Sequence, residues 1–515
     1  IPKRDWSSDV CSSDLKGPAA IGILCCLLSA CTVGPDYVKP KSVLPPQWSE
    51  LEEAQAAATA ADLGRWWTLF HDPVLDRLIG QAIESNKELR IAESRILEAR
   101  AQRGVVAADG YPNVNAGASY LRSQPSSNQT TSRHASQDAN FSTSKTPPRD
   151  LFTVGFDASW EIDIFGGVRR GVEAAEADIS AAQENKRDVL VSLLAEVARN
   201  YIQVRSDQRR IAIAKENIAA QRKTVELTEA RFEAGLSTEL DVAQAKAQLA
   251  TTEAGVPLLE SSSRQAMHQL AILLGEEPGA LLATLSEPAP IPVGPDSAPV
   301  GLPSDLLKRR PDIRRAEREL AAATARIGEA TADLFPKFAL VGALGYQSMD
   351  FRDLAHPTSR FWSYGPSVKW PVFDAGRIRA RVAVQDARQQ QARIRYEQAI
   401  LTALKDVEDA LVAHAKERSS RESRIVAEQA NEKAYQIASE LYAQGLKDFL
   451  NVLITQLALY SAQDALAQSD QAVATFMVSL FKSLGGGWDP GGPFLEPQAE
   501  GSPDEAAPQT TSDPS

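Results

Sequence analysis

Two long stretches without glycine or proline dominate the chain. The first covers 172–234 and stops at Gly235-Leu236, and the second covers 377–444 and stops at Gly445-Leu446. At a rise of about 1.5 Å per residue, each stretch would form one helix roughly 100 Å long. Few globular enzymes contain even one such helix. A duplicated pair, each preceded by short aromatic strands, predicts a tunnel of long helices joined to a β-barrel.

The first long stretch keeps an apolar residue at one position of a seven-residue repeat. This position is occupied without interruption by Leu190, Val197, Val204, Ile211, Ile218, Val225 and Phe232. A strict repeat of seven is typical of helices that supercoil around one another, whereas a helix in a globular core drifts off it. The apolar period also predicts helices over 74–107 and 305–333.

Each long helix follows two segments rich in aromatic and β-branched residues, which predict strands. They cover 114–121 and 151–164 in the first half, and 338–346 and 361–373 in the second. The fold expected from these elements is mainly α with a small β-barrel part.

The two halves can be aligned residue by residue. Pro112 matches Pro336 at an offset of 224 residues, whereas Trp160 matches Trp370 at an offset of 210. The first half therefore has 14 extra residues, and the polar segment 123–150 lies in the interval that must hold them. Because insertions settle in exposed loops, this segment is predicted to be the larger extracellular loop.

The expected organisation has two structural repeats between an anchored N-terminus and a polar tail. The segments are a non-native extension (1–15), a signal peptide with a lipobox (16–30), a lipidated arm (31–73), the first repeat (74–275), a linker (276–304), the second repeat (305–484) and a mostly disordered tail (485–515). Within the repeats, long helices are predicted over 168–234 and 377–444, and return helices over 238–274 and 447–484.

Charge and cysteine content exclude several function classes. The net charge of −12 disfavours a nucleic-acid partner. All four cysteines lie at or before position 31, and the five histidines are scattered, so no metal site or thiol nucleophile is predicted. No nucleophile elbow, phosphate loop or placed acid–base pair is present, and the chain is therefore not expected to be an enzyme.

The N-terminal region carries an export signal. Lys16 precedes the apolar run 19–28, and the small residues Ser29 and Ala30 lie directly before Cys31. This order resembles a bacterial lipobox, in which the cysteine is lipidated and becomes the first mature residue. An ordinary signal peptide with an incidental cysteine is the alternative. Residues 1–15 lack an initiator methionine and resemble translated adapter sequence, so they are left out of the fold.

Four strands are too few to close a barrel around a lumen. A sheet that faces lipid cannot leave its edges unpaired, so closure has to come from neighbouring copies. Three chains would supply twelve strands around one axis.

The motifs together resemble one known family. They are the lipobox, Gly34-Pro35-Asp36-Tyr37, the pair Trp66-Trp67, the paired segments Arg231-Phe232-x-x-Gly235-Leu236 and Leu441-Tyr442-x-x-Gly445-Leu446, and the run from Lys482 to Trp488. In this order, over about residues 31–488, they are similar to the TolC-like outer-membrane efflux factors, in the lipoprotein branch typified by OprM and NodT.

The resemblance implies a duplicated TolC-like fold in a homotrimer. Its twelve-stranded β-barrel would cross the outer membrane of a Gram-negative bacterium and continue into a long periplasmic α-helical barrel. The implied partners are a periplasmic adaptor protein, an inner-membrane RND pump and outer-membrane lipid. The implied function is that of a passive exit duct, with no cofactor other than the covalent lipid on Cys31.

The family also implies roles for residues at the ends of the long helices. Gly235, Leu236, Gly445 and Leu446 would form the tips that dock the adaptor, although glycine can also simply end a helix. The closed aperture is expected just before the tips. Its candidates are Glu229, Glu233, Ser439, Glu440 and Tyr442, and a solvated helix face is the alternative.

Aromatic residues of the strands are candidates for the membrane interface. Trp160, Trp362 and Trp370, together with Phe152 and Phe361, could form aromatic girdles. Packing at the strand–helix junction is the alternative for some of them.

Two other functions fit part of the sequence. A structural coiled-coil lipoprotein of the envelope would explain the heptads and Cys31, but not the duplicated aromatic strands. An exit duct of a type I secretion system would share the whole architecture. The sequence does not identify the transported substrate or the cognate pump.

Overall fold

A computed structural model describes residues 32–41, 44–50, 63–124, 126, 148–295 and 300–489. The chain divides into two compact units. Unit 1 contains residues up to 40, 96–181 and 316–396, and unit 2 contains 41–95, 182–315 and the residues from 397 onward. The predicted extension, signal peptide and Cys31 lie outside the described residues, as do most of the polar loop and of the tail.

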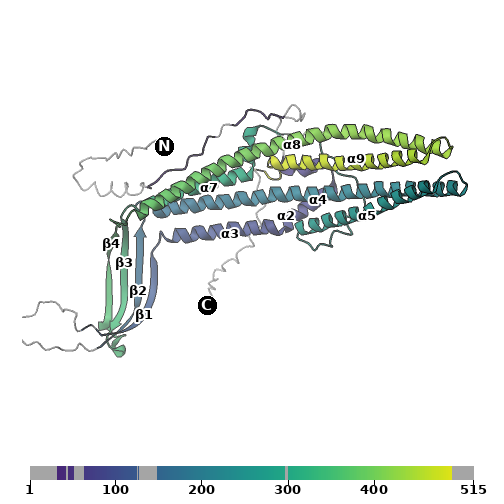
Figure 1. The fold of residues 1–515 in the computed structure, drawn as a ribbon. Helices are drawn as coiled ribbons and strands as arrows, with labels where there is room; N and C mark the ends of the chain where they lie inside the picture. The colour runs from purple at the N-terminus through teal and green to yellow at the C-terminus, as the bar shows by residue number, and fades with distance from the viewer. Residues whose placement is uncertain are drawn as a thin grey trace, which may run out of the picture. The chain divides into compact units, whose positions relative to one another are not determined.

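The structure is mainly helical (Figure 1). The α-helices are α2 (Pro73–Ser85), α3 (Lys87–Ala108), α4 (Gly167–Glu233), α5 (Glu239–Leu273), α6 (Leu306–Arg309), α7 (Pro311–Ala332), α8 (Arg377–Ala443) and α9 (Phe449–Ser483). Short 3-10 helices cover Leu63–Phe70, Pro303–Asp305, Phe351–Asp353 and Pro357–Ser359. The long helices α4 and α8 have 67 residues each, against the predicted 168–234 and 377–444.

The helices expected over 74–107 and 305–333 are each interrupted, which corrects both predictions. Asn86 separates α2 from α3 in an extended conformation, and its side chain accepts a hydrogen bond from the Leu89 amide and donates one to the Leu273 carbonyl. Arg310 separates α6 from α7 because Pro311 follows it, and a residue before proline avoids the helical conformation.

In unit 2, the backbone at each interruption packs tightly against the glycine that follows a return helix. Gly275 and Gly485 each follow a return helix with φ of +73°. A Cβ on Gly275 would lie 2.5 Å from the Ser85 carbonyl oxygen, and one on Gly485 would lie 2.9 Å from that of Arg309. Only glycine allows these approaches, and the return helices α5 and α9 are therefore fixed against the breaks.

The core of unit 2 joins segments that are far apart in the sequence. Trp66, which is 1% exposed, stacks on Phe481 with 5.3 Å between ring centroids. The Gly487 amide donates a hydrogen bond to the Leu63 carbonyl. The tryptophan segment near the start and the glycine segment near the end thus pack as one cluster.

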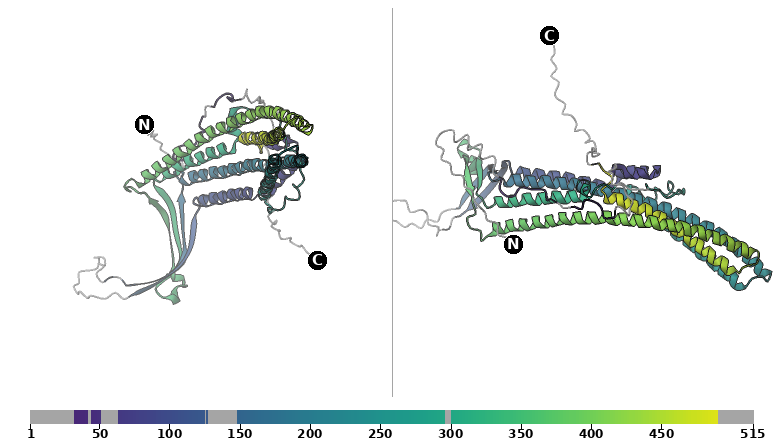
Figure 2. Two further views of the ribbon diagram at one scale, coloured as in Figure 1. Left: turned by 45° about the vertical axis from the view of Figure 1, so that its right-hand side comes forward. Right: turned by 90° about the horizontal axis from the view of Figure 1, so that it is seen from above.

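Unit 1 contains one antiparallel sheet in the order β1-β2-β3-β4 (Figures 1 and 2). Its strands are β1 (Asn113–Ser123), β2 (Arg149–Ile162), β3 (Lys337–Ser348) and β4 (Arg360–Lys369). The last strand ends four residues before the predicted 373, because Pro371 has no amide hydrogen to continue the ladder. In both figures no helix of unit 1 covers either face of this sheet.

A row of three glycines crosses the sheet. Gly117 pairs with Gly155, Gly155 pairs with Gly345, and Phe361 of β4 continues the row. A Cβ on Gly155 would lie 2.5 Å from the Leu344 carbonyl oxygen, and one on Gly345 would overlap the Val154 carbonyl oxygen. The strands β2 and β3 therefore approach each other more closely than residues with side chains permit.

This contact predicts that Gly345→Ala strongly lowers the yield of folded protein, because its Cβ has no room beside the Val154 carbonyl. Gly117→Ala is the matched control, since a Cβ at Gly117 meets nothing within 4 Å. Limited proteolysis of the two variants, expressed side by side, measures the difference. Equal resistance of the two proteins would contradict the packing argument.

Candidate functional site: channel wall and helical tips

One face of the sheet is apolar and exposed. Alternation along the paired strands puts most of the large apolar residues on this face. Each is more than a third exposed: Val114, Tyr120, Val154, Phe156, Trp160, Ile162, Leu340, Leu344, Trp362, Tyr364 and Val368. An apolar surface of this extent is unusual for a protein surface in water and points to contact with protein or lipid.

The opposite face of the sheet carries mainly polar and small side chains. Asn115 of β1 donates a hydrogen bond to Asp157 of β2, and Thr153 pairs with Gln347 of β3. Near the helix end of the same face, Glu161 and Lys337 form an ion pair of 3.6 Å. The sheet is thus apolar on one side and hydrophilic on the other.

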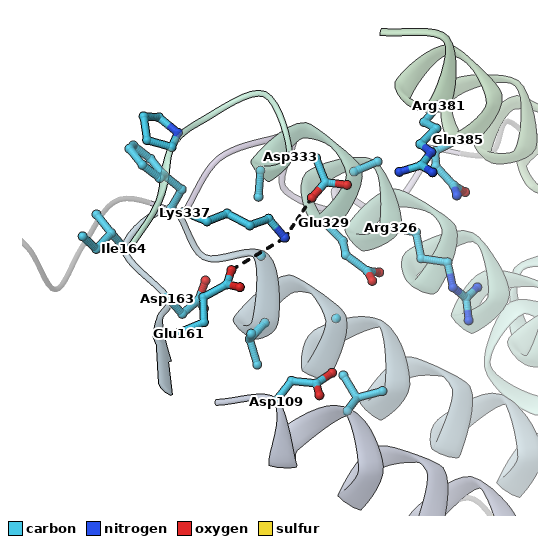
Figure 3. A pocket seen from close by; sticks show the side chains of 18 of the residues that line it. Asp109, Glu161, Asp163, Ile164, Arg326, Glu329, Asp333, Lys337, Arg381 and Gln385 are labelled. Carbon is cyan, nitrogen blue, oxygen red and sulfur yellow. Dashed lines mark ion pairs between the residues drawn. The ribbon is translucent and has the colours of Figure 1, made fainter. Parts of the chain in front are cut away.

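The polar face continues into a charged hollow in unit 1 (Figure 3). The hollow has a volume of about 870 Å³, and α3, α4, α7 and α8 contribute to its walls along with β2 and β3. Its charged residues carry both signs, and Lys337 bridges Glu161 and Asp333 across it. Other charged groups in the hollow are Asp109, Asp163, Arg326, Glu329, Arg377, Arg381 and Arg388. A hydrophilic surface therefore extends from the strands onto the helices.

The predicted tryptophans take different positions. The indole of Trp160 donates to the Gly110 carbonyl at 2.9 Å, and that of Trp370 donates to the Leu334 carbonyl at 3.1 Å. Both contact the strand–helix junction while remaining more than a third exposed, and their role at the membrane interface stays a prediction. Trp362 lies on the apolar face, where it stacks on Tyr364. Phe361 lies on the polar face, beside Gly345, because it is one residue out of phase with Trp362.

Aromatic residues gather at both ends of the apolar face. At the loop end, Phe152 stacks on Tyr120 and contacts Phe351. At the helix end lie Trp160 and Trp370. Phe152 and Trp160 are eight residues apart on β2, which corresponds to about 26 Å along a strand. An apolar band about 25 Å tall between two aromatic girdles is typical of membrane-spanning barrels, although strand tilt would shorten this one.

The two predicted tips have the same backbone structure. Gly235 and Gly445 have φ of +71° and +74°. The amides of Gly235 and Leu236 bond to the carbonyls of Phe232 and Arg231, and the second tip repeats the pattern. This is the Schellman ending of a helix, which requires the left-handed conformation that glycine adopts readily. Leu236 and Leu446 are 69% and 65% exposed at the turns.

Arg231 joins the two tips, a contact that the sequence reasoning missed. Its guanidinium donates a hydrogen bond of 2.8 Å to the Tyr442 carbonyl and lies 4.7 Å from the centre of the Tyr442 ring. Arginine and tyrosine are part of the paired sequence segments, but nothing in the sequence indicates that the first segment contacts the second.

The aperture candidates do not form one group in this chain. Tyr442 is only 4% exposed and packs in the tip core against Phe449, with Val225, Ala245 and Val452 in the same cluster. Glu229 forms an ion pair of 2.7 Å with Lys246. Glu233 and Glu440 are exposed, and Ser439 is half-buried. The role of these residues at an aperture stays a prediction.

The residues that follow Cys31 are held firmly in unit 1. The Val33 amide donates to the Phe165 carbonyl, just after β2, and Arg170 of α4 forms an ion pair of 2.6 Å with Asp36. Gly34 packs directly against Gly328 of α7, with no room for a Cβ on Gly34. The arm is thus fixed at the strand–helix junction.

A carboxylate of α7 anchors the next part of the arm. Glu317 accepts hydrogen bonds from Tyr37 and Lys39. Burial alone would raise the pKa of Glu317, but hydrogen bonds from Lys39 and Arg318, with their charges, hold it below its ordinary value.

Within the described ranges, no helix combines the length and apolar character that a transmembrane helix needs. The described residues also contain no group of three or more His, Cys, Asp or Glu side chains placed to bind a metal ion.

Comparison with known proteins agrees with these features. The sequence pattern of the outer membrane efflux protein family matches residues 78–276 and 302–486. The pyoverdine export outer membrane protein OpmQ of Pseudomonas aeruginosa is 34% identical over 465 residues, covering 90% of this chain and 95% of that protein. Nodulation protein T of Rhizobium leguminosarum bv. viciae is 31% identical over 469 residues, covering 91% and 93%.

A solved structure of the outer-membrane channel OprN has the same fold. It superposes with a TM-score of 0.79 at 36% identity and covers 89% of this chain and 100% of that one. The predicted resemblance to TolC-like channels of the OprM and NodT type is confirmed. The chain belongs to the outer membrane efflux protein family, and it is an outer-membrane efflux channel rather than an enzyme.

Proposed function

We propose that three copies of this chain close into a twelve-stranded barrel that crosses the outer membrane. The observation that carries the proposal is the open sheet with one exposed apolar face and one polar face. Strands β1 and β4 each leave one edge unpaired, and lipid offers no partner for backbone amides and carbonyls. Two copies would give eight strands, whose interior side chains fill, whereas three copies leave an open lumen.

The polar face then lines the lumen, and the charged hollow continues it into the periplasmic helices. Solutes that leave the pump would pass along this hydrophilic wall without a covalent step. The four helices that carry the hollow would form one third of an α-helical barrel. A bracing lipoprotein would need neither an apolar strand face nor a polar wall behind it, so the duct accounts for more of the structure.

Internal duplication supports a ring of six similar parts. Trp160 and Trp370 make equivalent bonds to the residues that precede β1 and β3, and Gly166 and Gly376 have φ of +78° and +83° at the starts of α4 and α8. Each half of the chain thus passes from strand to long helix in the same way. Two such halves in each of three chains give quasi-sixfold symmetry.

Single-channel recording in a planar bilayer tests the barrel. Ser363 lies on the polar face of β4 and Tyr364 on the apolar face. We expect Ser363→Trp to lower the conductance of the purified trimer, because the indole enters the lumen, and the control Tyr364→Trp to leave it unchanged. A protein without conductance, or equal effects of the two variants, would refute the assignment of the faces.

The tips are proposed as the docking surface for a periplasmic adaptor protein, which would connect the duct to an inner-membrane RND pump. Leu236 and Leu446 are exposed apolar side chains held at fixed turns, and equivalent turns end both hairpins. Exposed leucines on rigid turns could each make the same shallow apolar contact with the adaptor. Six such turns in a trimer would present one ring.

Replacing both leucines by glutamate should abolish drug export in cells, because a carboxylate would have to be buried at the contact, while trimer yield stays normal. Leu258→Glu is the control, since Leu258 is 73% exposed on α5 away from the turns. Minimum inhibitory concentrations, read beside trimer bands on a gel, provide the measurement. Normal export by the double variant would disprove docking at the tips.

Cys31 is proposed to carry the lipid anchor. It lies outside the described residues, but Thr32 packs against Gly166 at the start of α4. Acyl chains on the preceding residue would therefore begin at the strand–helix junction, which is the membrane boundary in the proposed barrel. Two or three acyl chains give stable anchoring where one does not.

Palmitate labelling of cells tests the anchor. The wild-type protein should incorporate label, and Cys31→Ser should incorporate none. Mass spectrometry of the mature N-terminal peptide identifies the modified residue. A mature wild-type protein with an unmodified Cys31 would eliminate the lipid anchor.

A further inference from the structure

The apolar face of the sheet contains a hollow of about 610 Å³. The glycine row and the small residues Ala116 and Ala118 form part of its lining. Larger apolar side chains complete it, namely Val154, Phe156, Leu344 and Tyr346. The hollow exists because Ala116 and Ala118 give β1 only small side chains at this level of the apolar face, whereas Tyr120 stacks on Phe152 nearer the loop end. The glycines contribute backbone to the lining, since they are in phase with the polar face.

Arg360 also lines the hollow and is the only charged residue to do so. It starts β4 and pairs in register with Tyr346. Its guanidinium is exposed and makes no hydrogen bond or ion pair with the described part of the chain. Arg122, near the same end of the sheet, forms an ion pair with Asp150 at 3.5 Å. Arg360 therefore differs from its neighbour in lacking a carboxylate.

An arginine on the lipid-facing side of a barrel is destabilising, and the cost rises from the interface toward the membrane midplane. A counter-charge would remove that cost. Strand β1, which would pair with β4 of the next copy, contains no Asp or Glu, and β4 contains none. Asp157 and Glu161 of β2 lie on the polar face. Asp150 of β2 lies on the apolar face, but it already pairs with Arg122 and accepts a hydrogen bond from the Tyr120 hydroxyl. These strands therefore supply no unpaired carboxylate to Arg360.

We propose that the hollow binds a phosphate-bearing lipid of the outer leaflet, with one acyl chain in the hollow and its phosphate on Arg360. The planar guanidinium can donate two parallel hydrogen bonds to phosphate oxygens. Arg360 lies at the loop end of the sheet, which is the outer-leaflet side of the proposed barrel. This inference rests on the proposed function, because it needs the apolar face to meet lipid.

Native mass spectrometry of the delipidated, full-length trimer in detergent tests the site, with diphosphoryl lipid A as the probe. Its dephosphorylated form is the ligand control. The wild type should retain the phosphorylated lipid. Arg360→Gln should weaken retention roughly tenfold or more, because hydrogen bonds to charged groups contribute about 1.5–3 kcal/mol. Ala118→Leu fills the hollow and should weaken retention of both lipids.

Arg352→Gln is the matched protein control, since it removes an exposed arginine from the neighbouring turn and not from the hollow. It should bind like the wild type. Equal retention of lipid A by Arg360→Gln and the wild type, or equal retention of the two lipids by the wild type, would overturn the inference. Conductance of Arg360→Gln is recorded in parallel. If Arg360→Gln conducts normally and binds lipid A as the wild type does, only the lipid site is refuted. If the wild-type protein does not conduct, the proposed function is refuted.

Discussion

Unpaired backbone groups at the edges of the four-stranded sheet impose the strongest constraint on this molecule. Strands β1 and β4 end the sheet, and its apolar face is exposed along its whole length. Water disfavours the apolar face, and lipid disfavours the open edges. The closed ring proposed above, set in a membrane, would satisfy both conditions. Its polar face would then be inside, which reverses the arrangement of a soluble barrel and would make the interior a path for water.

The structure also depends on the junction between each strand and the long helix that follows it. The two junctions, one in each half of the chain, are built in a similar way. Asp163 accepts a hydrogen bond from the Arg169 amide at the start of α4, and Asp374 accepts bonds from the amides of Gly376 and Ile378 at the start of α8. A carboxylate near a helix N-terminus binds free amides and offsets the helix dipole. Each long helix thus starts at a fixed point relative to its strand.

The sequence predicted the elements far better than their contacts. Two long helices and four strands follow from periodicity and from the positions of glycine and proline. The break at Arg310 could have been predicted, because Pro311 disfavours a helical residue before it. The break at Asn86 could not, since it depends on the distant Leu273 carbonyl. The burial of Tyr442 was missed for a similar reason: its cluster draws on four helices, and an aperture role inferred from one segment carries no information about the others.

The tip contact shows why long helices need such a cross-link. A long helical hairpin bends easily toward its tip, because local hydrogen bonds resist only local distortion. Arg231 connects the end of α4 to the end of α8 through one charge-assisted hydrogen bond and one cation–π contact, which together contribute about 2–4 kcal/mol. Moving the two hairpins together leaves this contact intact, whereas separating them breaks it. A partner that binds both Gly-Leu turns of one chain therefore meets a single body.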